Sequence, residues 1–294
     1  MKVSRGDRDI TVYVGVRPFE GEWIERQETV LNALKWQDVD GLTVKLVFFP
    51  DEISTLNYAI EHGYEGLVVG FWRHYLFPGK LRSFKNMFEA MLMDCETEIF
   101  VYINGDIILG PGILKWIQQN ALERNVLFSL PRHNWQWTGP LESPEDYERA
   151  LAESVPEEWT AVDFYALRAT EGRQQLIPFP PFILTAGSMD SYLVVKTGEL
   201  GWDRVLVPPD QFSMLHIEHP YSHPLKPGAS PDKVAKWAFN CGVYEQATAN
   251  FSPAILQDTS LKCFRGAERY GFKYGFPANK YQRPEDIMSS SQDE

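Results

Sequence analysis

The feature that most constrains the fold of this chain is the alternation of apolar runs with amphipathic stretches over its first 130 residues. The apolar runs are short and rich in β-branched residues, and the stretches between them carry apolar residues at helical spacing. Strands are predicted at residues 10–16, 42–49, 66–71, 98–103 and 125–130, and helices at 21–35, 54–62, 78–94 and 113–122, with Ser54 as an N-cap. This alternation predicts an α/β domain with a mostly parallel sheet.

The second half of the sequence is less regular. A loop with a short acidic helix is predicted at 135–158, a turn-rich segment at 177–182, a strand at 191–195, a strand and histidine-containing loop at 214–223, and a helix at 232–245. We therefore divide the chain into an α/β half at 1–130, a second half of the same domain at 131–264 and a tail at 265–294.

Composition limits the classes of function. The 294 residues carry a formal net charge of −12 and include three cysteines. A broad basic face for nucleic acid normally gives the opposite charge balance, and three cysteines without a C-x-x-C pair predict neither a disulfide framework nor a zinc knuckle. The N-terminus has no apolar signal core, and no apolar run approaches the length of a membrane span. A cytoplasmic protein without a transmembrane segment is expected.

The motif Asn104-Gly105-Asp106 follows the predicted strand at 98–103. Ligands of open parallel sheets bind beyond the carboxyl ends of the strands, where Gly105 permits a sharp turn and close approach of a ligand. A carboxylate such as Asp106 can hold Mg²⁺ or Mn²⁺ there. The alternative is an ordinary turn capped by Asp106.

The segment FVYINGDIILGPGILKWI around this motif resembles the metal-motif segment of GT-A glycosyltransferases, where the motif reads D-x-D or, as here, N-x-D. The pieces ITVYVGVRPF, RQETVLNALKWQ and SFKNMFEAML, and a second strand that ends at Asp51, are similar to the nucleotide-binding half of that family. The resemblance covers residues 10–130 and continues more weakly to 225. It implies a Rossmann-type mixed sheet flanked by helices, with an irregular C-terminal region on the acceptor side.

By that resemblance, several residues contact a nucleotide-sugar, with a UDP-sugar as the expected donor. Nucleotide base and ribose contacts fall to Arg17, Pro18 and Asp51, and the diphosphate contact falls to Arg82 or Lys80, although Arg17 and Lys80 can also be solvated surface charges. The further expected donor contacts are Asn104, Gly105, Arg132 and His133, and Trp135 and Trp137 either stack on a sugar ring or close the core. Because Asn104 replaces an acid and an amide is a weak ligand, Asp106 is expected to carry most of the metal contact.

Three histidines follow within eight residues of one another: His216, His219 and His223. In several GT-A enzymes a late histidine completes the metal site, so His216 is the favoured additional ligand and His219 the second choice. For His223 a backbone hydrogen bond in the proline-rich loop is the better interpretation.

Asp190 in the segment TAGSMD resembles the acid on the acceptor side of GT-A enzymes and is the candidate general base. Inverting transfer needs a carboxylate that takes the proton of the acceptor hydroxyl. The alternative is a turn cap after Gly187, and Asp203 is a further acid that can contribute.

Three classes of function remain: metal-dependent glycosyl transfer, nucleotidyl transfer, and a binding module without activity. Nucleotidyl transfer ranks low because Val14 to Pro18 lack the Gly-rich, basic signature of that class. The acceptor can be a glycan, a lipid-linked sugar or a hydroxymethylated pyrimidine in DNA. The basic, aromatic tail favours DNA mildly, though surface packing is the preferred interpretation of its residues Lys262, Arg265, Arg269, Lys273, Tyr274, Lys280 and Arg283.

Overall fold

The structure is a computed structural model, and it describes residues 9–121, 125–157, 162–184, 186–219, 230–257 and 263–265. A seven-stranded sheet forms its centre, with the strand order β10-β6-β9-β4-β1-β2-β3. All neighbouring pairs are parallel except those of β9, which runs antiparallel to both β4 and β6. These strands are β1 (Ile10–Gly15), β2 (Leu42–Phe48), β3 (Glu65–Val68), β4 (Ile99–Asn104), β6 (Val126–Ser129), β9 (Phe164–Arg168) and β10 (Asp203–Leu206).

A smaller four-stranded sheet has the order β5-β11-β7-β8. Its strands are β5 (Ile107–Leu109), β11 (Met214–Ile217), β7 (Arg132–Trp135) and β8 (Val155–Pro156). Because β5 starts directly after the Asn104-Gly105-Asp106 turn and pairs with β11, residues near positions 106 and 216 are brought together.

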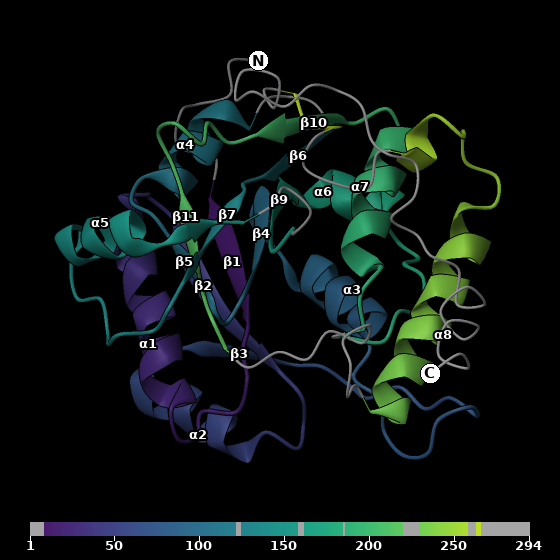
Figure 1. Ribbon diagram of the computed structural model, residues 1–294, viewed down its shortest axis with the longest axis horizontal. Coiled ribbons are helices and arrows are strands. Elements are labelled where there is room, and N and C mark those ends of the chain that lie inside the picture. The colour runs from purple at the N-terminus through teal and green to yellow at the C-terminus, as the bar shows by residue number, and fades with distance from the viewer. Residues whose placement is uncertain are drawn as a thin grey trace, which may run out of the picture.

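Helices cover both faces of the large sheet (Figure 1). Alternate residues of β1 show the two faces: Ile10, Val12 and Val14 belong to one core cluster, and Tyr13 to the other. The first cluster packs against α1 (Trp23–Leu34), α2 (Ile53–His62), α4 (Ile113–Asn120), α5 (Pro144–Glu153) and the small sheet. The second packs against α3 (Phe84–Asp94), α6 (Ala169–Gln175), α7 (Met189–Glu199) and α8 (Pro231–Thr248). Two 3-10 turns, η1 (Lys35–Gln37) and η2 (Ile255–Gln257), complete the described elements.

The predicted α/β fold with a mixed sheet between helices is confirmed, and all five strands predicted in the first half are present. Within the described residues, no helix combines the length and the apolar content needed to cross a bilayer.

Three local predictions were wrong. Residues 191–195 are part of the helix α7 and not a strand, because this short apolar run is the buried side of a helix packed on the sheet. The third helix begins at Phe84, capped by Ser83, since the chain before it forms a loop closed by a Trp72–Leu81 bridge. Ser54 is not an N-cap, since α2 already begins at Ile53.

Candidate active site and metal centre

A cavity of about 420 Å³ opens at the carboxyl ends of β1 and β4, which is where a parallel sheet binds its ligands. Gly105 lines this cavity, and its backbone N–H donates to the Gly15 carbonyl at 2.8 Å, which ties the end of β4 to the end of β1. A Cβ atom on Gly105 would lie 2.8 Å from Gln27 Oε1 and 3.0 Å from the Gly15 oxygen. The glycine is therefore required by the close approach of the two chain segments.

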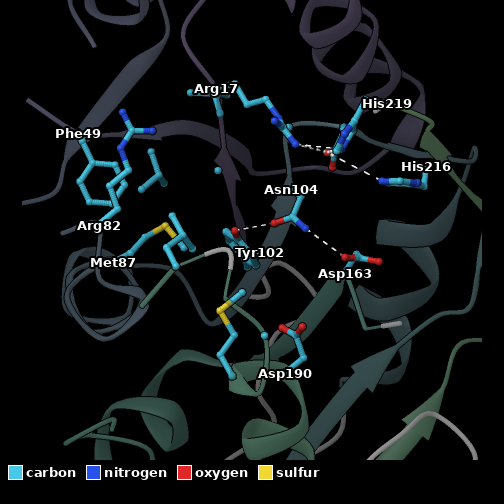
Figure 2. A pocket seen from close by; sticks show the side chains of 18 of the residues that line it. Arg17, Phe49, Arg82, Met87, Tyr102, Asn104, Asp163, Asp190, His216 and His219 are labelled. Carbon is cyan, nitrogen blue, oxygen red and sulfur yellow. Dashed lines mark hydrogen bonds and ion pairs between the residues drawn. The ribbon is translucent and has the colours of Figure 1, made fainter. Parts of the chain in front are cut away.

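Asp106 lines this cavity together with two histidines, His216 and His219, which are labelled in Figure 2. Its Oδ2 atom is 3.2 Å from His219 Nε2 and 4.0 Å from His216 Nε2, and one ligand atom from each of the three residues lies within 4.8 Å of the others. The side chain is buried, and its Oδ1 atom has no hydrogen-bond partner among the described residues. A buried carboxylate oxygen without a partner fits a site for a cation, because leaving it unsatisfied costs free energy.

The small sheet explains why these residues meet. His216 pairs in register with Ile107, and the N–H of Ile217 donates to the Asp106 carbonyl at 2.9 Å. Both histidines predicted from the sequence therefore lie next to Asp106, although they are more than 100 residues away in the chain. His223 lies outside the described residues.

The protonation states of Asp106 and His216 favour metal binding. Burial alone would raise the pKa of Asp106, but the hydrogen bond from His219 and the charges of His216 and Arg17 outweigh it and lower that pKa. Burial and the nearby Arg132 charge lower the pKa of His216. At neutral pH the site thus offers an anionic carboxylate and a neutral imidazole, which are the forms that bind metal.

Arg17 also reaches this group. Its Nη2 atom lies 3.4 Å from Asp106 Oδ2 and 2.9 Å from His219 Nε2, and its guanidinium stacks 4.2 Å from the centroid of the Trp23 ring. The buried Gln27 holds the Arg17 backbone through both its N–H and its carbonyl. A cation bound at Oδ2 would compete with this guanidinium, whereas the buried Oδ1 atom has no partner among the described residues.

Asn134 orients the His216 ring through its Nδ1 atom, the ring nitrogen that is not directed at Asp106, and the sequence did not indicate this role. The Nδ1 atom of His216 lies 3.2 Å from Asn134 Oδ1, and the Asn134 amide donates to Glu157. Since the amide nitrogen is used by Glu157, the Asn134 oxygen must accept the Nδ1 proton. The lone pair of His216 is thereby left on Nε2, on the side of Asp106.

We expect Asn134→Ala to weaken metal binding by about 10- to 100-fold, the usual effect of losing a hydrogen bond that orients a metal-bound histidine. Titration of Mn²⁺ by electron paramagnetic resonance measures this without any turnover. His133→Ala on the same strand is the matched control, because its Nδ1 atom contacts Ser154, away from the metal site. Equal affinities in the two variants would contradict this role of Asn134.

Asn104 does not point at the metal group. Its Oδ1 accepts from the Tyr102 hydroxyl at 2.7 Å, and its Nδ2 donates to Asp163 Oδ1 at 3.2 Å. Asp163 is also paired with Arg132. An aspartate at position 104 would face the Asp163 carboxylate, so this link requires an amide.

Asp190 lies in the first turn of α7 and lines the same cavity. Burial, together with the negative charge of Asp163, raises the pKa of Asp190 to about 7, although the Tyr165 hydroxyl donates to its carboxylate. A carboxylate with a pKa near neutrality is suited to proton transfer. Asp163 and Tyr165 were missed in the sequence because they come from β9 and the segment before it, which no motif marked.

Arg82 lines the opposite end of the cavity and lies over the Phe49 ring, 5.2 Å from its centroid. It pairs with Glu52 at 2.8 Å and with Asp51 at 3.6 Å. Asp51 therefore holds Arg82 and does not itself line the cavity, and neither does Pro18. The other predicted residues with cavity-lining side chains or backbone are Arg17, Asn104, Gly105, Asp106, Arg132, Asp190, His216 and His219.

Several residues considered as secondary candidates lie elsewhere. Trp135 is 2% exposed and belongs to the core, with Trp137 packed against it. Lys80 lies 5.0 Å from the centroid of the Phe71 ring, outside the cavity. Asp203 pairs with Arg265, whereas Lys262 and the rest of the basic tail lie outside the described residues.

No protein-family model and no curated protein matches this chain. Solved structures do resemble it. The mannosyltransferase PcManGT from Pyrobaculum calidifontis, in complex with GDP-Man and Mn²⁺, is 14% identical over 97% of this chain and 86% of its own, with a TM-score of 0.46. S. aureus TarS 1-349 in complex with UDP is 13% identical over 85% of this chain and 70% of its own, with a TM-score of 0.47.

A third resemblance is to the 4-diphosphocytidyl-2C-methyl-D-erythritol synthase of Anaerococcus prevotii, at 11% identity, 80% and 96% coverage and a TM-score of 0.40. Likeness at these TM-scores carries no argument about activity, which rests on the side chains described above.

Proposed function

We propose that this protein is a metal-dependent glycosyltransferase that moves a sugar from a nucleotide-diphosphate donor to a hydroxyl acceptor, with a UDP-sugar as the expected donor. One observation carries the proposal. A buried carboxylate with an unpartnered oxygen, Asp106, is grouped with two imidazoles in the same cavity as Asp190, an acid whose pKa is raised to about 7.

In this proposal Asp106, His216 and His219 hold the cation. Two imidazoles and one carboxylate suit Mn²⁺ better than Mg²⁺, since Mg²⁺ prefers oxygen ligands alone. A bound cation would offset the charge that develops on the diphosphate leaving group. The mannosyltransferase PcManGT, in complex with GDP-Man and Mn²⁺, is an example of a nucleotide-sugar and a divalent cation bound to one protein.

Asp190 acts as the general base. The acceptor hydroxyl gives its proton to the Asp190 carboxylate while its oxygen forms a bond to the anomeric carbon of the donor sugar. The bond from that carbon to the diphosphate oxygen breaks, and its electron pair leaves with the nucleoside diphosphate. Arg17 and Arg82, which line the two ends of the cavity, supply cationic donors for diphosphate or base.

A donor screen tests the proposal. Purified protein is incubated with UDP- and GDP-sugars and with Mn²⁺, Mg²⁺ or a chelator, and release of the nucleoside diphosphate is measured. We expect release with Mn²⁺ that exceeds release with Mg²⁺ and is lost with the chelator. Tight donor binding without release in any metal would contradict transfer and support a binding module.

A further inference from the structure

The segment that joins β3 to α3 has an unusual charge for this protein. Between Glu65 and Glu89 the chain contains no acidic residue but four basic ones, Arg73, Lys80, Arg82 and Lys85, whereas the whole chain has 40 acidic and 28 basic residues. We call residues 69–83 the basic loop. It extends past the lower end of α8, where the blue ribbon marks it (Figure 1).

The tip of this loop exposes apolar side chains. Tyr75 is 89% exposed and its neighbour Leu76 is 57% exposed. Arg73 and Lys80, both exposed, flank them across a shallow hollow. Among the residues that the structure describes, neither cation has a carboxylate within 4.0 Å, and the Lys80 ammonium lies over the Phe71 ring, 5.0 Å from its centroid.

The rest of the basic loop is fixed by a backbone bridge and by packing of its rings against α8. Trp72 and Leu81 exchange two backbone hydrogen bonds, of 2.8 and 2.7 Å. The rings of Trp72, His74 and Phe77 pack on Phe239 of α8, with centroids 5.8, 5.0 and 5.5 Å away. Tyr75 and Leu76 are thus presented outward by a braced base: the Tyr75 ring lies 4.4 Å from the His74 ring, centroid to centroid, and the Leu76 N–H donates to His74 Nδ1 at 3.2 Å.

We propose that the basic loop docks this protein on an anionic lipid bilayer. Exposed aromatic and aliphatic side chains enter the headgroup region of a membrane, and adjacent Arg and Lys contact lipid phosphates. A platform for stacking on a neutral sugar would need aromatic faces, which Leu76 does not offer, and it would gain nothing from two exposed cations without a carboxylate beside them. The mixture of side chains therefore favours a lipid surface.

The loop leads directly to the cavity. Arg82, near its end, lines the cavity, and Leu81 packs with Ile183 and Ala186, next to the cavity residues Leu184 and Gly187. Docking would bring the mouth of the cavity to the membrane surface. If the proposed function holds, the acceptor is then carried by a lipid; the docking itself does not depend on that function.

Vesicle binding tests the docking without any turnover. The full chain is sedimented with phosphatidylcholine vesicles and with vesicles that also contain phosphatidylglycerol, at low and at high salt. We expect binding only to the anionic vesicles, weakened by salt. Arg73→Ala/Lys80→Ala should bind about 25-fold more weakly, since each cation near such a surface contributes roughly fivefold.

Matched variants separate this patch from net charge and from folding. Lys35→Ala/Arg149→Ala makes the same change of charge on other exposed sites and should bind like the wild type. Tyr75→Ser/Leu76→Ser should lose binding even at low salt, whereas Ile60→Ser/Met93→Ser, also exposed apolar positions, should keep it. Unchanged thermal unfolding would show that each variant is folded.

A local probe gives a second measurement. The described cysteines Cys95, Cys241 and Cys263 are buried, so Leu76→Cys can be labelled selectively with an environment-sensitive dye. Anionic vesicles should shift its emission to the blue. No preference for anionic vesicles, equal binding by the loop and control variants, or a dye that responds to soluble glycans and not to vesicles would overturn the proposal.

Discussion

Replacement of Asp106 by asparagine should abolish Mn²⁺ binding and lower the turnover of a nucleotide-sugar by about 10³-fold, since a metal that stabilises a leaving group contributes several kcal/mol to the transition state. Asp106 supplies the only carboxylate of the proposed metal group, and its Oδ1 atom is the unpartnered oxygen. Asparagine keeps the size of the side chain but replaces an anionic oxygen with an amide. His216 and His219 alone would then have to hold the cation.

Electron paramagnetic resonance of Mn²⁺ and steady-state release of the nucleoside diphosphate measure the two effects separately. The backbone bond from Ile217 to the Asp106 carbonyl does not depend on the side chain, so the turn and β11 should stay in place. Asp203→Asn is the control, since Asp203 is paired with Arg265 outside the cavity. Full turnover in Asp106→Asn would show that the metal site has been assigned to the wrong residues.

The part of this site that sequence could predict is the part with local signals. An apolar run followed by Asn-Gly-Asp places a carboxylate at the end of a buried strand, and β4 is such a strand. Three histidines close together near a strand end gave the second signal. The strand β11 was itself recognised, although its pairing with β5 could not be read from the sequence.

The residues that the sequence did not indicate act across long separations. Asp163 meets Asn104 from 59 residues away, and Asn134 meets His216 from 82 residues away. Both depend on pairings, of β9 with β4 and of β7 with β11, that no spacing of residue types encodes. Asp190 lines the cavity, but it lies in the first turn of a helix, whereas the sequence predicted a strand directly after it. A short buried apolar run such as 191–195 does not distinguish a helix from a strand.

Asn104 illustrates the difference between a motif and its chemistry. The sequence treated it as a weakened metal ligand and a donor contact. In the structure its amide bridges Tyr102 and Asp163. Asp163 in turn pairs with Arg132, and its negative charge raises the pKa of Asp190. The amide therefore belongs to the group around Asp163 and Asp190 and not to the metal group, and an acid at this position would add repulsion to an already acidic region.

Replacement of Asp190 by asparagine should lower turnover by about 10²- to 10⁴-fold while leaving Mn²⁺ binding unchanged, because the loss of a general base removes proton transfer and not the metal ligands. The wild type should lose activity as the pH falls through about 7, since protonated Asp190 cannot accept a proton. The residual activity of the variant should lack this step. Glu199→Gln, at the exposed end of the same helix, is the control and should retain the wild-type profile.

The same carboxyl group should also affect stability. The pKa of Asp190 is raised in the folded protein from its ordinary value of 3.8 to about 7, so between these values the folded state holds a proton that the unfolded state has released. The free energy of unfolding therefore falls as the pH rises through this range. Asp190→Asn removes the effect, and its Tm above pH 7 should exceed that of the wild type. A variant that loses turnover but gains stability is the behaviour of a functional group held in an unfavourable environment, whereas a loss of both would indicate that Asp190 serves the fold.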